Sequence, residues 1–108
     1  MDRAATFRSF IARKPDDPFP RYGLAMELRA RGDRPGAIAE FATLIERFPD
    51  YGPASLRAGT TRADDGQLGA AADVLRRGLA AADRQRDSPA ARELASALAE
   101  VEARARQA

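Results

Sequence analysis

The feature that most constrains this chain is an internal repeat with a period of 34 residues. The segment FRSFIARKPD at residues 7–16 is echoed by FATLIERFPD at residues 41–50. When the chain is shifted against itself by this period, aromatic, Gly, Ala and Pro residues fall into one register. The aligned sets are Phe7, Phe41 and Leu75; Ile11, Ile45 and Leu79; Pro15 and Pro49; Ala25 and Gly59; Gly32 and Gly66; Ala37 and Ala71. Chance rarely produces so varied a set of matches, so the pattern indicates a repeat architecture.

Each repeat unit is expected to contain two helices joined by a short turn. Asp17 and the following Pro18 have the side chains and spacing of a helix start, and Asp33 is placed to cap the next helix. Between them, Gly32 can adopt the left-handed conformation in which many helices end. Pro49 closes the second helix, because the residue before a proline disfavours the helical backbone. Similar signals recur later in the chain, at Pro53, Gly66, Ser88 and Pro89.

Apolar side chains recur at helical spacing inside these segments. In the second helix of the first unit they fall at i, i+4, i+7, i+8 and i+11, at Ala37, Phe41, Leu44, Ile45 and Phe48. Ala25, Ala37, Gly59 and Ala71 mark points where two helices are expected to cross closely. Phe7, Phe41 and Leu75 are expected to fill the space between successive layers. The sequence therefore predicts helix pairs that stack in register.

This order of residues resembles the signature of tetratricopeptide repeat (TPR) proteins. The first unit carries the signature in order, with Leu24, Ala25, Leu28, Gly32, Ala37, Phe41, Leu44 and Pro49. The second unit matches it more weakly, with Ala58, Gly59, Gly66, Ala71, Leu75 and Gly78. It departs at Arg62, where a large apolar residue is usual, and at Asp83, where Pro is usual. The resemblance implies an all-α fold, an α-solenoid of antiparallel helix pairs with about six helices, similar to small stand-alone bacterial TPR proteins.

The resemblance covers nearly the whole chain, which we interpret as a single TPR-like domain. The expected divisions are an N-terminal half-repeat helix at 1–15, a first repeat at 18–51, a second repeat at 52–85 and a C-terminal capping helix at 88–108. A lone repeat cannot bury its apolar faces, and about three repeat equivalents are usually needed. Two units with a helix on either side reach that number.

Proteins of this family are mostly binding modules in which the first helices of successive units line a concave groove. The resemblance therefore implies a scaffold or adaptor that binds a peptide or helix of another protein. Helical geometry places the expected groove residues at Tyr22, Met26, Arg29, Leu56, Arg57, Thr60 and Arg92. Their apolar centre and basic flank suit an extended segment or amphipathic helix that carries an acidic group. In the alternative interpretation, Tyr22 and Met26 pack on neighbouring helices and the arginines are solvated.

Enzymatic chemistry is not expected from these residue types. The chain has no Cys and no His, which removes thiol nucleophiles, the usual general base near neutral pH and the commonest metal ligand. The paired carboxylates Asp16–Asp17 and Asp64–Asp65 lie in expected turns, where Asp is favoured without any catalytic need. No phosphate-binding loop or dinucleotide fingerprint occurs. We therefore expect no catalytic residue, no cofactor and no metal.

The charge pattern does not favour nucleic acid or membrane partners. The 18 Lys and Arg residues are balanced by 16 Asp and Glu residues, interspersed along the chain, whereas nucleic-acid binding needs basic residues gathered on one face. RNA-reading repeats recognise about one base per repeat, so two units would give little specificity. No apolar run is long enough to span a bilayer and no signal peptide is evident, so we expect a cytoplasmic protein. Self-assembly stays open, because a chain that begins with half a repeat leaves an apolar edge for a second copy, and residues 90–108 could dock in a neighbour.

Overall fold

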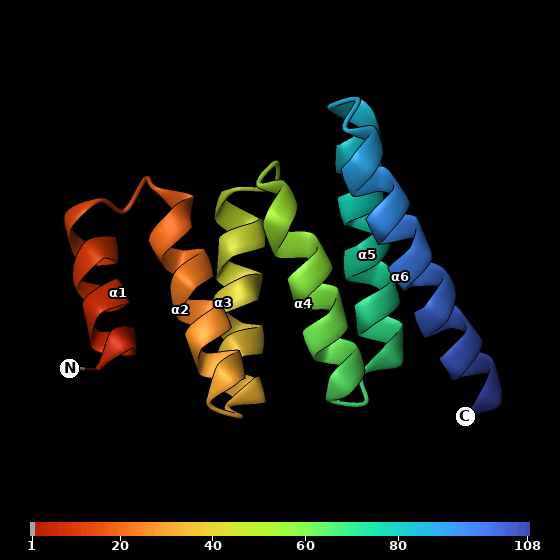
Figure 1. Cartoon of the computed structure of the whole chain (residues 1–108), viewed down its shortest axis with the longest axis horizontal. Helices are drawn as coiled ribbons and strands as arrows, with labels where there is room; N and C mark the ends of the chain where they lie inside the picture. The colour runs from red at the N-terminus through yellow and green to blue at the C-terminus, as the bar shows by residue number, and fades with distance from the viewer. Residues whose placement is uncertain (1) are drawn as a thin grey trace.

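A computed structural model describes residues 2–108 of the protein, and these residues form six α-helices and no strand. The helices are α1 (Arg3–Arg13), α2 (Pro18–Ala30), α3 (Arg34–Arg47), α4 (Gly52–Asp64), α5 (Leu68–Arg84) and α6 (Ser88–Gln107). They run alternately up and down in chain order, with the N-terminus at one end of the row and the C-terminus at the other (Figure 1). The all-α solenoid expected from the sequence is therefore confirmed.

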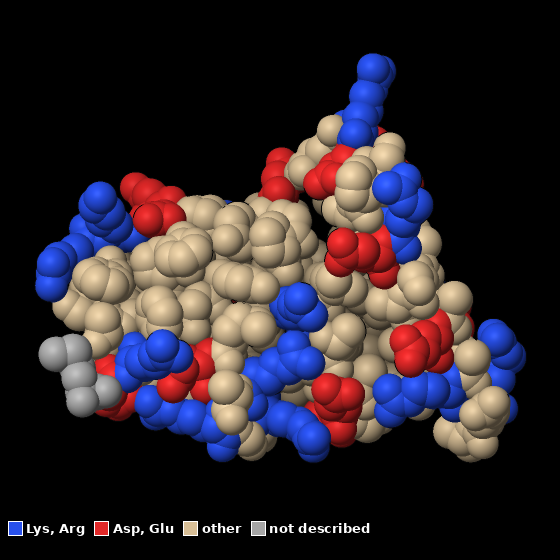
Figure 2. Space-filling view, in the orientation of Figure 1, with Lys and Arg blue, Asp and Glu red and all other residues tan. Residues whose placement is uncertain are grey.

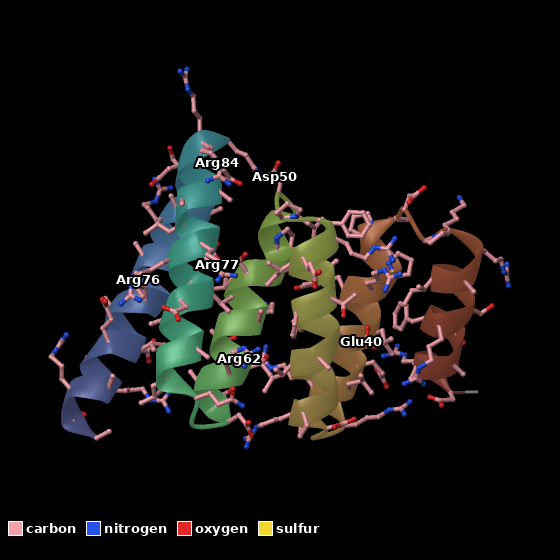
Figure 3. The ribbon with its side chains drawn as sticks, turned by 180° about the vertical axis from the view of Figure 1, so that it is seen from behind. Glu40, Asp50, Arg62, Arg76, Arg77 and Arg84 are labelled. Atoms are coloured by element: carbon pink, nitrogen blue, oxygen red, sulfur yellow. The ribbon has the colours of Figure 1, made fainter. Side chains whose placement is uncertain are left out.

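The row has two faces that are built from different helices. α2 and α6 lie in front of α3 and α5 in the view of Figure 1, and the order is reversed in the view from behind in Figure 3. The principal dimensions are 42 × 31 × 19 Å, so the molecule is a flattened slab. We call the side seen in Figure 1 the front face and the side seen in Figure 3 the back face.

Helix starts are fixed by aspartate caps. The Asp17 carboxylate accepts a hydrogen bond of 3.0 Å from the Phe19 amide, and Asp33 accepts one of 2.9 Å from the Gly36 amide. Both caps were predicted. The last helix begins at Ser88, and its cap is Asp87, which accepts from the Ala90 amide at 3.2 Å. Each cap satisfies one of the backbone donors that a helix leaves free at its N-terminus.

Three turns share one backbone design. Gly32 and Gly66 have φ of 83° and 81° and lie two residues beyond the ends of α2 and α4. This is the left-handed conformation, which was predicted for Gly32, whereas only a turn was predicted at Gly66. It lets the chain reverse without a steric penalty at Cβ. Arg86 adopts the same conformation beyond α5, with φ of 56°. The third turn thus places an arginine where the other two have glycine.

Large and small side chains alternate through the core. Phe41 and Leu75 are buried to 1% and 0% exposure, as expected, and Phe7 is half-buried on the terminal helix α1. A Cβ atom on Gly59 would lie 2.5 Å from the Leu75 side chain. Glycine is therefore required at this crossing of α4 and α5, because a larger residue would displace the leucine.

The second unit differs from the first where its helix pair ends. α3 has 14 residues and ends before Pro49, whereas α5 has 17 residues and passes through Asp83, where the repeat lacks its proline. Figure 1 shows α5 and α6 projecting beyond the other helices as a result. The Gln85 side chain donates a hydrogen bond of 3.0 Å to the Asp50 carbonyl, and Arg84 lies 3.8 Å from the Asp50 carboxylate. The Gln85 hydrogen bond ties the projecting end back to the α3–α4 turn, and the exposed Arg84–Asp50 pair adds little.

Candidate functional site

A cleft of about 350 Å³ opens between α4 and α6, with α2 at one end. We call it the front cleft. Its lining residues are Tyr22, Gly52, Pro53, Leu56, Arg57, Asp87, Pro89, Ala90, Glu93 and Leu94. In Figure 2 the surface is notched where α5 and α6 rise above α4, and uncharged side chains cover much of the neighbouring front of the molecule. Three of the seven predicted groove residues, Tyr22, Leu56 and Arg57, come together in this cleft.

Tyr22 is held in place by two other aromatic rings. Its ring centroid lies 6.3 Å from that of Phe41 and 5.8 Å from that of Tyr51, at interplanar angles of 64° and 63°. Edge-to-face contacts of this kind are each worth about 0.5–1.5 kcal/mol beyond simple burial. Burial raises the pKa of the Tyr51 phenol, and the neighbouring Tyr22 and Asp17 raise it further. Tyr22 therefore packs on its neighbours and lines the cleft at the same time.

The cleft carries opposite charges on its two sides. Arg57 is exposed on α4, and within residues 2–108 no hydrogen bond or ion pair occupies its guanidinium. On the α6 side lie Asp87, which caps the helix, and the exposed Glu93. Leu56 forms the apolar base and packs against the core that α4, α5 and α6 share. The cleft can therefore hold an apolar group between a cationic edge and an anionic edge.

The other predicted groove residues are not part of the front cleft. Met26 is half-buried and packs against the first core cluster. Arg29 lies 3.7 Å from Asp64 in an ion pair that links α2 to α4. The Thr60 hydroxyl donates a hydrogen bond of 3.2 Å to the carbonyl of Arg57, and Arg92 is exposed on α6 outside the cleft lining. The contacts of Met26, Arg29 and Thr60 are thus with the chain itself.

A larger hollow lies on the back face and was missed by sequence reasoning. It measures about 600 Å³, and we call it the back groove. Its lining residues are Ile38, Phe41, Ala42, Ile45, Glu46 and Pro49 from α3 and the turn after it, Ser55, Ala58 and Arg62 from α4, and Val74, Arg77, Ala80 and Arg84 from α5. A signal was present in the two arginines seven residues apart on α5, Arg77 and Arg84, with the small Ala80 between them. The predicted groove residues lie on α2, α4 and α6, whereas the walls of the back groove come from α3 and α5.

The described part of the chain offers no site for a metal ion. Among residues 2–108, no group of three or more Asp and Glu side chains is placed to hold one. None of the helices in this range has the length and apolar character that crossing a membrane requires.

Comparison with known proteins identifies the fold. Neither a protein-family model nor a curated protein sequence matches the chain. Among solved structures, the solution structure of a TPR domain protein from Salinibacter ruber is 29% identical, with a TM-score of 0.77 over 82% of this chain and 90% of that one.

Two further structures share the fold at lower identity. The TPR2B domain of yeast Sti1, in a complex with pHsp70, is 21% identical with a TM-score of 0.86, covering 94% of this chain and 81% of that one. The type III secretion translocator chaperone SycD of Yersinia enterocolitica is 14% identical with a TM-score of 0.83, covering 95% of this chain and 72% of that one. The repeat register, the six helices and these likenesses together make the chain a TPR-like helical-repeat protein.

Proposed function

We propose that the chain is a non-catalytic protein–protein interaction module, a scaffold or adaptor, that binds a peptide or helix of a partner protein in the front cleft. Two structural neighbours support this proposal. The yeast Sti1 domain is in a complex with pHsp70, and SycD is a translocator chaperone. Both have the same fold over more than nine-tenths of this chain.

The observation that carries the proposal is the convergence of Tyr22, Leu56 and Arg57 from two repeats into one cleft. Tyrosine and arginine are the residue types most often found at the energetic centres of protein interfaces. Tyr22 is already fixed by Phe41 and Tyr51, so binding would cost little side-chain entropy at this position. The cleft is therefore preorganised to receive an apolar side chain.

The charges of the cleft define the chemistry of its ligand. An apolar side chain would sit on Leu56, and an acidic group beside it would reach the unoccupied Arg57 guanidinium. Glu93 on the opposite side favours a neutral or basic group there. A peptide fits the cleft best when its acidic group faces Arg57 and its neutral or basic group faces Glu93. The reverse orientation would place like charges together.

Affinity purification with charge variants tests the proposal. Arg57→Glu is expected to lose the partner that the parent protein captures, with unchanged helicity by circular dichroism, because Arg57 is exposed and its side chain makes no hydrogen bond or ion pair within residues 2–108. Arg8→Glu makes the same charge change on α1, away from the cleft, and is expected to keep the partner. Undiminished capture by Arg57→Glu would refute binding in the front cleft.

The variant Glu93→Arg tests the order of charges. It removes the anionic edge and leaves Arg57 in place. A partner with an acidic group at the cleft is expected to be retained or bound more tightly. Loss of the partner in Glu93→Arg together with its retention in Arg57→Glu would mean that the ligand contributes a basic group instead.

Self-assembly is the second candidate, and it is supported by the exposure of two phenylalanines. Phe10 on α1 is 44% exposed and Phe19 at the start of α2 is 63% exposed. A second copy could cover these rings. Sedimentation velocity over a concentration series tests this candidate. Self-association that Phe10→Ser and Phe19→Ser abolish would support it, and a monomer at all concentrations would exclude it.

A further inference from the structure

We infer that the back groove is a second docking site, and that it binds an acidic amphipathic helix of a partner protein. This site is separate from the front cleft and goes beyond the function proposed above. Its lining residues make α3 and α5 the walls and α4 the floor, and Figure 3 shows these three helices side by side from behind, with α4 in the middle. The shape and the charge of the groove favour such a helix, and the helices α1 and α6 of a second copy fit the groove less well.

The shape of the groove matches a helix. Small side chains at Ala42, Ala58 and Ala80 leave the hollow open between larger apolar residues of α3 and α5. The α5 wall extends from Val74 to Arg84, which is about 15 Å at the rise of an α-helix. That length accommodates about three helical turns. Three turns of an amphipathic helix would present an apolar stripe of matching length to the groove.

The charge of the groove is strongly one-sided. Three arginines, Arg62, Arg77 and Arg84, line it together with a single acid, Glu46. Figure 3 shows Arg77 and Arg84 on the side of α5 that faces α4, whereas Arg76 lies on the α6 side, where it pairs with Glu102 at 3.0 Å. An acidic ligand is therefore favoured along the α5 wall.

The arginines of the α5 wall are available to a ligand. Within residues 2–108, no hydrogen bond or ion pair occupies the Arg77 guanidinium. Arg84 and Asp50 lie 3.8 Å apart and are 65% and 75% exposed, and such exposed pairs contribute little. Arg77 and Arg84 are seven residues apart, so they lie on one side of α5 and about 10 Å apart along its axis. Two carboxylates two turns apart on a partner helix would meet both.

An extended strand is a poorer occupant than a helix. The backbone groups of α3 and α5 are hydrogen-bonded within their own helices. No sheet edge is therefore offered to which a strand could add its main-chain hydrogen bonds. Recognition must come from side chains, which suits a helix with an apolar stripe and an acidic flank.

A second copy of the chain is also a poorer occupant. The terminal helix α1 carries Arg3, Arg8 and Arg13 and no acid, so the arginines of the groove would repel it. α6 carries acids, but its Leu94 and Val101 are buried in the core that it shares with α5. α6 would have to leave its own molecule to dock in another. A partner of different sequence is the occupant that the charges favour.

Two designed peptides test the inference on the full chain. Both are Ala-based, end-capped and about 18 residues long, since isolated helices below about 15 residues are marginal in water. Both carry a Leu stripe with i, i+3, i+4 and i+7 spacing. One has Glu at two flanking positions seven residues apart, and the other has Lys at the same positions. Binding is measured by titration, and the site is mapped by amide chemical shifts of the labelled protein.

The Glu peptide is expected to bind at least about tenfold more tightly than the Lys peptide, because two charge contacts change sign between them. Shift changes are expected along α3 and α5. Arg77→Glu is expected to remove the preference for the Glu peptide, whereas Arg8→Glu and Arg57→Glu retain it. The last variant separates this site from the front cleft, so the two proposals can fail independently.

Several outcomes would overturn the inference. These are equal binding of the two peptides, shift changes confined to the front cleft, or no shift change from either peptide along α3 and α5. Inorganic phosphate that perturbs the same amides as strongly as the Glu peptide would identify a site for small anions instead. Self-association that Arg77→Glu abolishes would identify a second copy as the occupant.

Discussion

The two repeat units build the same helix pair with different side chains. The pair α2–α3 packs around Phe41. The Tyr22 ring contacts Phe41 on one side and Tyr51 on the other. The pair α4–α5 packs around Leu75, and the chain has no aromatic residue after Tyr51. The register pairs Phe41 with Leu75 and Ala25 with Gly59. A smaller core residue in the second unit is thus accompanied by a smaller residue at the helix crossing.

Both units therefore keep their layers filled, although the residues that fill them differ between the units. Gly59 lets α4 approach Leu75 so closely that a Cβ atom would lie 2.5 Å from its side chain. Closer backbones offset the smaller side chain, because an interior loses stability wherever a void remains.

The largest effect is expected at Phe41. Phe41→Ala should reduce the free energy of unfolding by about 3–5 kcal/mol, and Leu75→Ala by about 2–5 kcal/mol. Small domains have only about 5–15 kcal/mol in total, so the loss at Phe41 is a large share of the stability. Urea denaturation followed by circular dichroism measures both changes. A Phe41→Ala protein that unfolds at a urea midpoint near that of the parent would show that the ring is not central to packing.

The next effect is expected at the helix crossing. Gly59→Ala should cost about 1–3 kcal/mol, because the new methyl group displaces Leu75. Gly69 is the matched control, since it also lies in a helix but has open space where a Cβ would be. Gly69→Ala should stabilise the protein by up to about 1 kcal/mol. If both substitutions change the unfolding midpoint in the same direction, close approach does not set the role of Gly59.

A smaller effect is expected at the turn after α5. Arg86→Gly should stabilise the protein by about 0.5–1 kcal/mol, because Arg86 has a positive φ that glycine adopts without penalty. The reciprocal Gly66→Arg should destabilise it by a similar amount or more. The midpoint of thermal unfolding measures the stability change in both variants. A lower midpoint for Arg86→Gly would mean that the arginine side chain makes a contact that outweighs its backbone strain.

The smallest effect is expected from the aromatic cluster at alkaline pH. Burial raises the pKa of Tyr51 in the folded protein above its unfolded value of about 10. The protonated phenol is therefore favoured by folding, and this contribution is complete below about pH 10 and is lost as the pH rises through the folded pKa. The difference in unfolding free energy between the parent and Tyr51→Phe should shrink or reverse across this range. If the difference in unfolding free energy does not vary with pH, the pKa of Tyr51 is not raised by folding.

Local features of the fold followed from the sequence, whereas contacts between distant residues did not. The caps at Asp17 and Asp33 and the turn at Gly32 depend on a few adjacent residues, so their types and spacing were sufficient. The ion pair of Arg29 with Asp64 joins two repeats, and helical spacing placed Arg29 in the groove instead. The left-handed Arg86 carries no sequence signal, because no residue type there favours that conformation.

The sequence predicted part of the front cleft but not the back groove. Helical spacing within α2 and α4, together with the 34-residue register that aligns the two helices, assigned Tyr22, Leu56 and Arg57 to one surface, and the structure gathers them in the front cleft. The back groove depends on how α3, α4 and α5 leave space between them, which no single helix encodes. The division into repeats at 18–51 and 52–85, and the binding role of either site, remain proposals.

Site-directed photo-crosslinking in the cells that express the protein shows whether a partner protein lies in the front cleft. The photoreactive residue benzoylphenylalanine is placed in turn at position 90 in the front cleft, at position 80 in the back groove and at position 8 on α1, so that Arg57 and Arg77 stay in place. Binding in the front cleft predicts that position 90 crosslinks a distinct protein that position 8 does not. Crosslinking from position 8 alone, or the same products from all three positions, would contradict the proposed function.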